Sequence, residues 1–295
     1  MSFTPSSRSG QGGERASSSP GLCTTYEGHN TEYLEHILPY VDYIEVTPDA
    51  IAQYRDGEII LHQPSLADLK SLGANTGIIV HGVGLSIGSY DGYSQYYIRL
   101  LDTLFEQLNV IWHSEHLAYT TVNGENLGTM LALPKTEQVL DMICERVSAL
   151  QTRYGLPFLL ENVVHLLPDF PGTFSEAGFL NALTEKTGCG LLLDVYNLEC
   201  DAQNNKFDID AFLDELNMES VREIHVACGT ELEGFLVDVH TRTTRDSTIA
   251  LAQRILQRAG NVEAVTFELL HQAIPALGYE VITNELMRLR QHLLR

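Results

Sequence analysis

The run GLLLD at residues 190–194 stays apolar until an aspartate ends it, and this pattern recurs along the chain. A histidine or carboxylate ends or nearly ends six other apolar runs: VDYIEV (41–46), TGIIVH (76–81), NVIWHSEH (109–116), PFLLE (157–161), REIHVA (222–227) and VTFE (265–268). Buried parallel strands read as continuous apolar runs, and α/β barrels gather their chemistry at the carboxyl ends of such strands. The runs therefore predict parallel strands that converge on a polar site.

Helix-like segments separate these runs, and a further run, GLCTTY at 21–26, comes first. The expected helices cover 30–38, 64–72, 92–108, 135–154, 174–187, 208–216, 244–259 and 278–293. Alternating strands and helices imply parallel βαβ units, and eight of them predict an α/β fold closed as a (β/α)8 TIM barrel. An open doubly wound sheet is the alternative. It would normally carry a glycine-rich phosphate loop after its first strand, and GLCTTYEGHN is not one.

The length of 295 residues fits one barrel domain, which we expect over residues 21–295 because no repeat or interior linker divides the chain. Residues 1–20 are rich in serine and glycine and lack an apolar core. This composition predicts a disordered tail and not a signal peptide. The chain also has no apolar stretch long enough to span a bilayer.

The charge of the chain bears on its binding partners, and its cysteines bear on its cellular compartment. The chain has 39 acidic and 18 basic residues, a net charge of −21, which argues against nucleic acid or an anionic membrane as a partner because phosphate binding needs clustered Lys and Arg. Five cysteines show no CxxC pair. In a chain of this length they predict reduced thiols and a cytoplasmic protein.

Side chains able to bind metals are concentrated at the predicted strand ends. His81 opens the turn HGVGLSIGS, whose glycines let the backbone fold tightly beside a ligand. Glu161 and Asp194 each follow an apolar run, where a carboxylate is costly to bury unless it is paired or bound to a cation. Asn197, three residues after Asp194, adds a neutral oxygen donor.

Two short motifs carry further donors. In WHSEH, His113 and Glu115 share one strand face while His116 points to the other, so only part of this group can reach one site. Asp238 and His240 form a D-x-H pair that extended backbone would place on one face. Six other histidines have no such register and are expected to be surface or capping residues: His29, His36, His62, His165, His271 and His292.

The number of donors exceeds what one ion needs. The eight candidates are His81, His116, His225, His240, Glu161, Asp194, Asp238 and Glu268. A transition metal takes roughly four to six ligands, so the set predicts two ions, or three. Four imidazoles and four carboxylates suit iron, manganese or zinc, and the donors alone do not choose among them.

Several motifs occur together in the order seen in one family. They are HGVGLSIGS (81–89), SEHLAY (114–119), LEN (160–162), SEAGFLNALTEKTGCGLLLDVYN (175–197), EIHVA (223–227) and the D-x-H pair before a last strand that ends in Glu268. On these motifs the chain resembles the multinuclear non-haem iron-dependent oxidative enzymes, the group that includes the methanobactin-biosynthesis oxidase. The similarity covers nearly all of the chain from residue 21.

The resemblance implies a barrel of the xylose-isomerase type, with two or three irons in mixed ferrous and ferric states. It also implies dioxygen as co-substrate, a ribosomally made precursor peptide modified at cysteine or a C-terminal residue, and a partner protein that binds the peptide's leader. By position, the family's metal ligands fall on the eight donors, and Asn197 matches a further ligand. Glu115 and Asn162 are expected to orient ligands through hydrogen bonds, and Tyr196 to line the pocket.

The chain departs from the family beside the ligands. ENVVHL stands where ENPSSY is common, Tyr196 replaces an asparagine, and HVACG lacks the second histidine of HLAGH. Leu269 and Leu270 replace a tryptophan and an aspartate after the last glutamate. These positions are the ones expected to touch substrate, so they leave the substrate and the oxidation product open.

Two other functional classes fit the same barrel and donors. One is a redox-inert metal enzyme, either a phosphodiesterase, which the acidic charge disfavours, or a sugar isomerase, which should place a lysine near the metals. None of the chain's lysines stands at a predicted strand end. The other class is a non-catalytic protein that stores metal or binds a peptide.

Overall fold

The computed structural model describes residues 19–55, 58–72, 76–167 and 172–294. Only the last two residues of the tail predicted for 1–20 fall inside these ranges. No helix in this part of the chain is long and apolar enough to cross a membrane.

Eight parallel strands close a barrel in chain order, each hydrogen-bonded to the next and the last to the first. They are β1 (Gly21–Tyr26), β2 (Tyr43–Val46), β5 (Gly77–Gly82), β6 (Val110–His116), β9 (Phe158–Glu161), β10 (Gly190–Asp194), β11 (Val221–Val226) and β14 (Ala264–Phe267). The predicted TIM barrel is therefore confirmed. The doubly wound alternative is excluded because β1 pairs with both β2 and β14.

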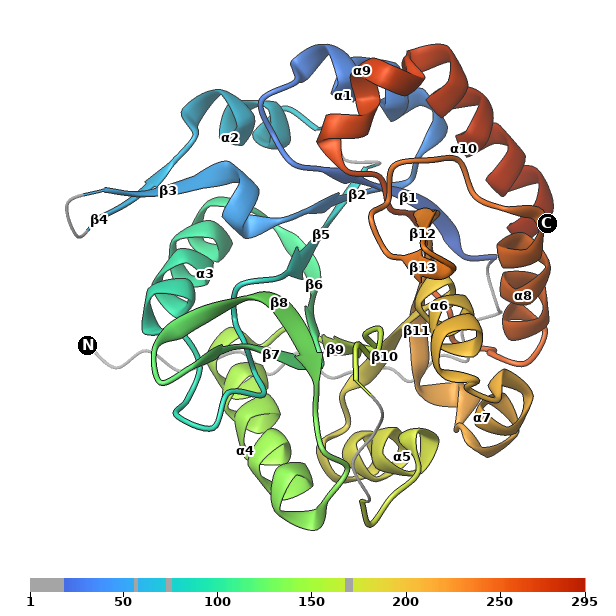
Figure 1. Ribbon diagram of the computed structural model, residues 1–295. Coiled ribbons are helices and arrows are strands. Elements are labelled where there is room, and N and C mark those ends of the chain that lie inside the picture. The colour runs from blue at the N-terminus through green and yellow to red at the C-terminus, as the bar shows by residue number, and fades with distance from the viewer. Residues whose placement is uncertain (1–18, 56–57, 73–75, 168–171, 295) are drawn as a thin grey trace, which may run out of the picture.

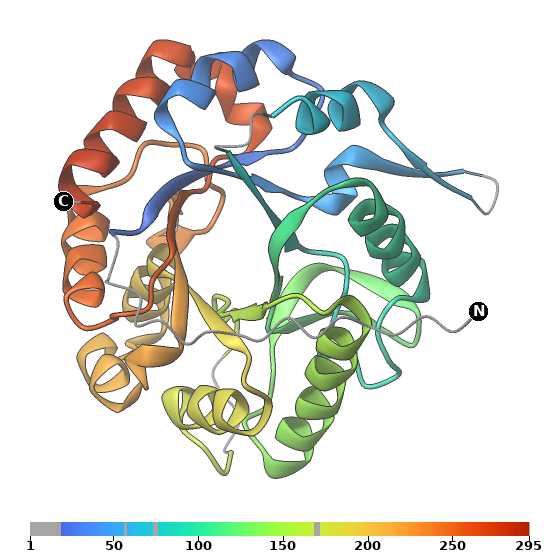
Figure 2. The same cartoon turned by 180° about the vertical axis from the view of Figure 1, so that it is seen from behind.

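Helices surround the barrel, as Figures 1 and 2 show from its two ends. They are α1 (Thr31–Ile37), α2 (Gln63–Lys70), α3 (Gln95–Gln107), α4 (Glu137–Tyr154), α5 (Glu176–Thr187), α6 (Val195–Asn205), α7 (Ile209–Glu215), α8 (Asp246–Leu256), α9 (Ile274–Leu277) and α10 (Tyr279–Leu293). Single 3-10 turns occur at Leu38–Tyr40, Pro48–Ile51, Met218–Ser220 and His271–Ala273. Every predicted helix is present within a few residues of its expected ends.

The ends of these helices follow ordinary capping chemistry. Asn30 and Thr136 accept a hydrogen bond from a backbone N–H in the first turn of α1 and α4, and His62 does so for α2. Helices α4 and α5 end at Gly155 and Gly188, whose left-handed backbone favours glycine. The capping role expected for His62 is confirmed.

Two helices and three hairpins among the described residues were not predicted, the short α9 being one of the helices. Helix α6 follows β10 directly, and its polar sequence VYNLECDAQNN hides the helical period. The other additions are antiparallel hairpins: β3 (Ala52–Arg55) with β4 (Glu58–Leu61), β7 (Ala118–Val122) with β8 (Glu125–Ala132), and β12 (Thr230–Leu232) with β13 (Phe235–Val237). Each hairpin follows the carboxyl end of a barrel strand. The β7–β8 and β12–β13 hairpins lie at the mouth of the barrel, whereas β3–β4 extends away from it (Figure 1).

The barrel interior changes from apolar to polar along the strands. An apolar layer packs at the amino-terminal level, formed by Cys23, Ile79, Trp112, Leu159, Leu192 and Ala264. Successive side chains on a strand point to opposite faces, so the next inward residue lies two positions later. That register places Ser114, Glu161 and Asp194 in the next layer, and all three are buried. The chain therefore directs its polar strand ends inward at one mouth.

Candidate metal centre

Two histidines and a glutamate from three adjacent strands form the first group of donors. Oε2 of Glu161, at the end of β9, lies 3.1 Å from Nε2 of His81 and 3.1 Å from Nε2 of His116. The second nitrogen of each ring is already held, since His116 Nδ1 donates to the carbonyl of Gly82 at 2.9 Å and His81 Nδ1 lies 2.9 Å from Ser114 Oγ. The free nitrogens of both rings therefore face Glu161.

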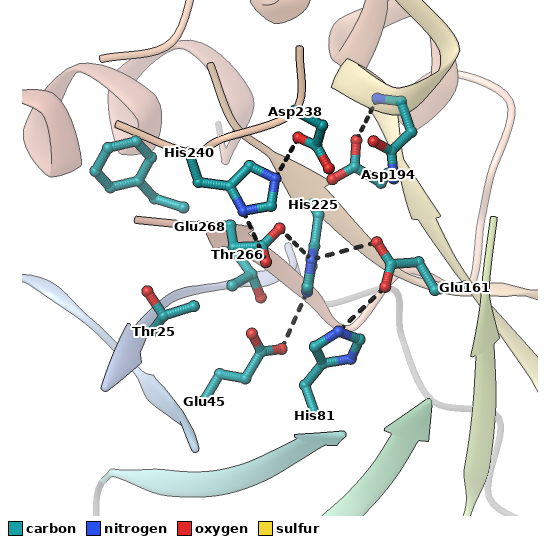
Figure 3. A network of polar contacts seen from close by, with 12 residues as sticks. Thr25, Glu45, His81, Glu161, Asp194, His225, Asp238, His240, Thr266 and Glu268 are labelled. Carbon is teal, nitrogen blue, oxygen red and sulfur yellow. Dashed lines mark hydrogen bonds and ion pairs between the residues drawn. The ribbon is translucent and has the colours of Figure 1, made fainter. Parts of the chain in front are cut away.

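A second group continues from the first through Glu161. Donor atoms of Glu161, Asp194, His225 and Glu268 all lie within 4.8 Å of one another. Nδ1 of His225 is 3.1 Å from Glu268 Oε2 and 3.9 Å from Glu161 Oε1, and Figure 3 shows this ring standing between the two carboxylates. Glu161 is thus common to both groups, with one oxygen toward each.

Asp238 and His240 enter the site from the segment after β13. His240 Nε2 contacts Asp238 Oδ1, and its Nδ1 lies 3.1 Å from Glu268 Oε1. The prediction of extended backbone for this pair is wrong, because His240 has a φ of 39°, in the left-handed region. Non-glycine residues seldom adopt this conformation, and they are found in it where the surroundings enforce it. The turned backbone aims both side chains at Glu268 and Asp194 (Figure 3).

The approach of this segment depends on a glycine that lies between β11 and β12. A Cβ on Gly229 would lie 1.8 Å from the carbonyl oxygen of Val237 and 3.0 Å from the amide nitrogen of Val239. These are backbone atoms, which cannot swing away. Gly229 is therefore the residue that lets the D-x-H segment lie against the short connection between β11 and β12.

Burial and neighbouring charges shift the pKa of several donors in the two groups. Burial, with neighbouring carboxylates, raises the pKa of Glu161 and of Asp194 well above the usual range. Burial would also raise the pKa of Glu268, but His240 and His225 hold it well below its usual value. Burial together with His81 lowers the pKa of His116 to about 3, so this ring is neutral at pH 7. A neutral imidazole is the form that binds metal.

Six donor atoms of this set are buried without a hydrogen-bond partner in the described part of the chain. They are His81 Nε2, Glu161 Oε2, Asp194 Oδ2, Asn197 Oδ1, Asp238 Oδ1 and His240 Nε2. Four of these atoms face one another in close contacts that do not count as hydrogen bonds, His81 Nε2 with Glu161 Oε2 and His240 Nε2 with Asp238 Oδ1. Buried polar atoms are almost always hydrogen-bonded, so this set needs a common explanation. Divalent or trivalent cations fit, because imidazole nitrogens and carboxylate oxygens are the donors that iron, manganese and zinc accept.

Hydrogen bonds to the backbone fix the strand ends that carry the ligands. Asn162 holds Asp194 twice, since its Nδ2 donates to the Asp194 carbonyl at 3.1 Å and its Oδ1 accepts from the Asp194 amide at 2.8 Å. Thr25 holds Leu269, next to Glu268, in the same two-sided way, at 2.7 Å and 3.0 Å. Asn197 Nδ2 donates to the carbonyl of Asn162 at 3.0 Å.

Two residues expected near the ligands lie elsewhere. Glu115 is on the helix-facing side of β6, where His113 Nε2 lies 2.8 Å from its Oε1, and Ser114 is the residue that contacts His81. Tyr196 is fully buried in a small cluster with Cys200, and it is not among the described residues that line the cleft beside the site. The sequence did not predict the contact of Ser114 with His81 or that of Thr25 with Leu269. Both contacts join different strands, so they can be recognised only once the strand pairing is known.

His165 differs from the surface or capping role expected for it. It is held in a largely buried network, with Nδ1 2.5 Å from Asp201 Oδ2 and Nε2 3.3 Å from Glu176 Oε2. Lys135 Nζ also lies 2.7 Å from Glu176 Oε2. Burial would lower the pKa of His165, but the hydrogen bonds to Asp201 and Glu176 raise it to about 9. The correction follows from helix α6, which supplies Asp201 and was not predicted.

A cleft of about 390 Å³ opens beside the metal centre. Its described lining comes from the β7–β8 hairpin, the segment after β9, helix α6 and the β12–β13 hairpin: Thr129, Met130, Val163, Val164, His165, Leu166, Asn197, Asn204, Asn205, Phe235, Leu236, Val237 and Asp238. Asn197 and Asp238 join this cleft to the ligand set, and most of the remaining wall is apolar. No Lys or Arg occurs among the described lining residues.

Solved structures share the fold of this chain. D-psicose 3-epimerase from Clostridium cellulolyticum H10, in a complex with D-tagatose, aligns with a TM-score of 0.59 at 12% identity, covering 93% of this chain and 99% of the epimerase. Endonuclease IV from Thermus thermophilus aligns with a TM-score of 0.54 at 15% identity, covering 93% of this chain and 99% of the endonuclease. At these identities the likenesses show a shared barrel fold and nothing more.

Proteins related to this chain by sequence share a higher identity with it than these solved structures do. A UPF0276 protein of Acaryochloris marina is 33% identical over 238 residues, which are 80% of this chain and 83% of that protein. A UPF0276 protein of Caulobacter vibrioides is 30% identical over 237 residues, 80% of this chain and 82% of that protein. Residues 25–293 match the family described as the RiPP precursor modification enzyme MbnB/TglH/ChrH, where RiPP denotes a ribosomally made, post-translationally modified peptide. The chain therefore belongs to this family, the multinuclear non-haem iron-dependent oxidative enzymes indicated by its motifs.

Proposed function

We propose that this protein is an iron-dependent, dioxygen-using oxidase that modifies a ribosomally made precursor peptide. The observation that carries the proposal is the sharing of Glu161 between the two donor groups. A carboxylate with one oxygen toward each group can bridge two neighbouring ions, as in other sites with metals about 3.5–4 Å apart. Family membership supports the peptide as the substrate class.

In the proposed centre, each donor group would hold one ion. His81, His116 and Glu161 would hold one ion, and Glu161, Asp194, His225 and Glu268 would hold a second. Asp238 and His240, with Asn197, would complete the set and supply ligands for a third. Iron bound there would provide one-electron redox chemistry and open positions for dioxygen and for a substrate group.

The chain itself contributes orientation and exclusion of water. The Gly82 carbonyl and Ser114 fix the rings of His116 and His81, so that both present Nε2 without rearrangement. The ligand layer is closed below by the apolar layer of the barrel interior. Solvent and substrate therefore reach the centre from the mouth.

The cleft between the β7–β8 and β12–β13 hairpins is the proposed substrate entry. Its apolar walls suit the side chains of a peptide better than a phosphate, because the described lining lacks the Lys and Arg that bind phosphate. The cleft ends at Asp238 and Asn197, which would bring a bound peptide residue beside the ions. A partner protein that binds the leader would deliver the peptide to this entry.

The proposal is tested by loading the anaerobically purified protein with ferrous iron and adding air and the precursor peptide encoded beside its gene, with the partner protein. Mass spectrometry should show a mass change in the peptide that depends on both iron and dioxygen. The Asp194→Asn variant should abolish it. Stoichiometric zinc in the isolated protein, with no iron-dependent mass change, would instead favour a redox-inert metal enzyme.

A further inference from the structure

A contact beneath the metal centre spans the barrel interior. Nε2 of His225, on β11, lies 3.0 Å from Oε2 of Glu45, on β2, and both side chains are fully buried. The two strands are not neighbours in the barrel, so the contact crosses its interior. Figure 3 shows Glu45 on the side of the imidazole opposite Glu161. The ring is therefore held between the ligand layer and a carboxylate below it.

The second carboxylate near this nitrogen is engaged elsewhere. Oε1 of Glu223 lies 3.8 Å from His225 Nε2, too far for a hydrogen bond. Its oxygens accept hydrogen bonds from Thr266 Oγ1 at 2.6 Å and from Trp112 Nε1 at 2.7 Å. The two glutamates therefore differ in their partners. Glu223 accepts hydrogen bonds from Thr266 and Trp112, whereas Glu45 accepts from His225.

We propose that Glu45 is a positioning residue for the metal centre, accepting the Nε2–H of His225 and so directing the Nδ1 lone pair at the ions. Only the tautomer with hydrogen on Nε2 presents a lone pair at Nδ1, which faces Glu161 and Glu268. A carboxylate on the far nitrogen of a ligating histidine fixes both the tautomer and the ring orientation. The inference rests on the proposed metal centre and adds a residue outside its ligand set.

The role also accounts for a carboxylate in an otherwise unfavourable place. A fully buried glutamate costs free energy unless it is paired, and the Glu45 side chain is fully buried. Oε1 of Glu45 has no hydrogen-bond partner within the described residues. His225 is the residue that compensates this burial. A cation held at His225 Nδ1 would make the Nε2–H a stronger hydrogen-bond donor, and it would thereby strengthen the hydrogen bond to Glu45.

The experiment compares Glu45→Ala, Glu45→Gln and the control Glu223→Gln, which removes a second buried carboxylate near the same imidazole. Zinc alone is the probe, with its affinity measured by competition against a chelator. Histidine labelled with nitrogen-15 then reports which nitrogen of His225 binds zinc. Thermal unfolding of the metal-free forms shows whether each variant is folded.

Glu45→Ala should bind zinc about 10–100-fold more weakly than the wild type, the loss typical of such partners. Glu45→Gln, which keeps an acceptor oxygen, should recover part of the loss, and Glu223→Gln should bind like the wild type. The wild-type spectrum should show Nδ1 bound to zinc and a slowly exchanging proton on Nε2. That proton should exchange quickly in Glu45→Ala.

Wild-type affinity in Glu45→Ala, or zinc on Nε2 of His225, would overturn the positioning role while leaving the metal centre intact. Equal losses in Glu45→Ala and Glu223→Gln, without recovery in Glu45→Gln, would also overturn it, because they would indicate a purely structural effect. A wild-type protein that takes up neither zinc nor iron would overturn the proposed metal centre and this inference with it.

Discussion

Oε2 of Glu161 lies 3.1 Å from Nε2 of His81, on the strand two places away in the barrel. The other oxygen of Glu161 faces His225, 3.9 Å away, so this carboxylate connects the two donor groups. Its burial and raised pKa mean that the chain places a charge where it is unfavourable without a cation. The proposed centre therefore depends on this carboxylate and on the residues that orient its partners.

Glu161→Gln should remove metal from both groups at once. The amide keeps the shape of the side chain but cannot bridge two ions, so we expect metal affinity to fall by more than the roughly 100-fold upper range for outer hydrogen-bond partners. Iron content per chain, measured after anaerobic loading and desalting, checks this. Glu35→Gln, on the exposed face of α1, is the control and should load like the wild type.

The metal-free Glu161→Gln protein should be at least as stable as the metal-free wild type at pH 7. The folded pKa of Glu161 is raised, so its stabilising contribution is complete below its unfolded pKa and is lost as the pH rises through the folded pKa. Glutamine cannot ionise and avoids this loss. A variant that melts well below the metal-free wild type would mean that Glu161 is a structural and not a ligand residue.

Ser114→Ala and Glu115→Gln separate the two faces of β6. Ser114 Oγ accepts from His81 Nδ1, so its loss should leave that ring free to turn and weaken metal binding about tenfold. Glu115 contacts His113 on the helix side, so Glu115→Gln should change metal affinity little. Zinc affinities of the two variants give the answer. A larger loss in Glu115→Gln would restore the role expected from the sequence.

Gly229→Ala should displace the segment that carries Asp238 and His240. Its new methyl group would meet the Val237 carbonyl at 1.8 Å, and overpacking of this kind costs about 1–3 kcal/mol. We expect the metal bound by Asp238 and His240 to be lost, while the ions at Glu161 stay. Gly260→Ala is the control, because a Cβ there meets its nearest atom at 3.6 Å. Equal metal content in the two variants would contradict the prediction.

His165 should make stability fall at alkaline pH. Its pKa is raised from 6.5 to about 9 when folded, so its contribution is fully present below pH 6.5 and is lost as the pH rises through 9. The loss should be on the order of 2 kcal/mol, since each pKa unit corresponds to about 1.4 kcal/mol and neighbouring charges reduce the effect. Urea unfolding of His165→Gln should lack this decline, and the exposed control His292→Gln should keep it.

The barrel and six of the eight proposed donors, all but Asp238 and His240, could be predicted because both depend on a short-range pattern. An apolar run that ends in a histidine or carboxylate marks a strand and a site residue together. Glu45 carries the same pattern in VDYIEV, yet its partner His225 is 180 residues away. Nothing in the sequence joins two residues across a barrel interior, so its role required the structure.

The residues that orient the proposed ligands were less predictable, because their contacts also depend on the tertiary structure. Ser114 and Glu115 are adjacent, and which of them faces His81 depends on strand register, which one residue inverts. The turned backbone of His240 is set by tertiary contacts and not by its own preference, because histidine seldom adopts a positive φ. The hairpins that form the cleft arise from insertions at the barrel mouth, where apolar periodicity is weak.

Mössbauer spectroscopy and iron quantification on protein loaded anaerobically with iron-57 would probe the shared carboxylate itself, for the wild type and for Glu161→Gln. We expect two or three irons per chain in the wild type, with magnetically coupled sites, and loss of that coupling in the variant. A single uncoupled iron in the wild type, or coupled irons that persist in Glu161→Gln, would contradict a centre built around Glu161.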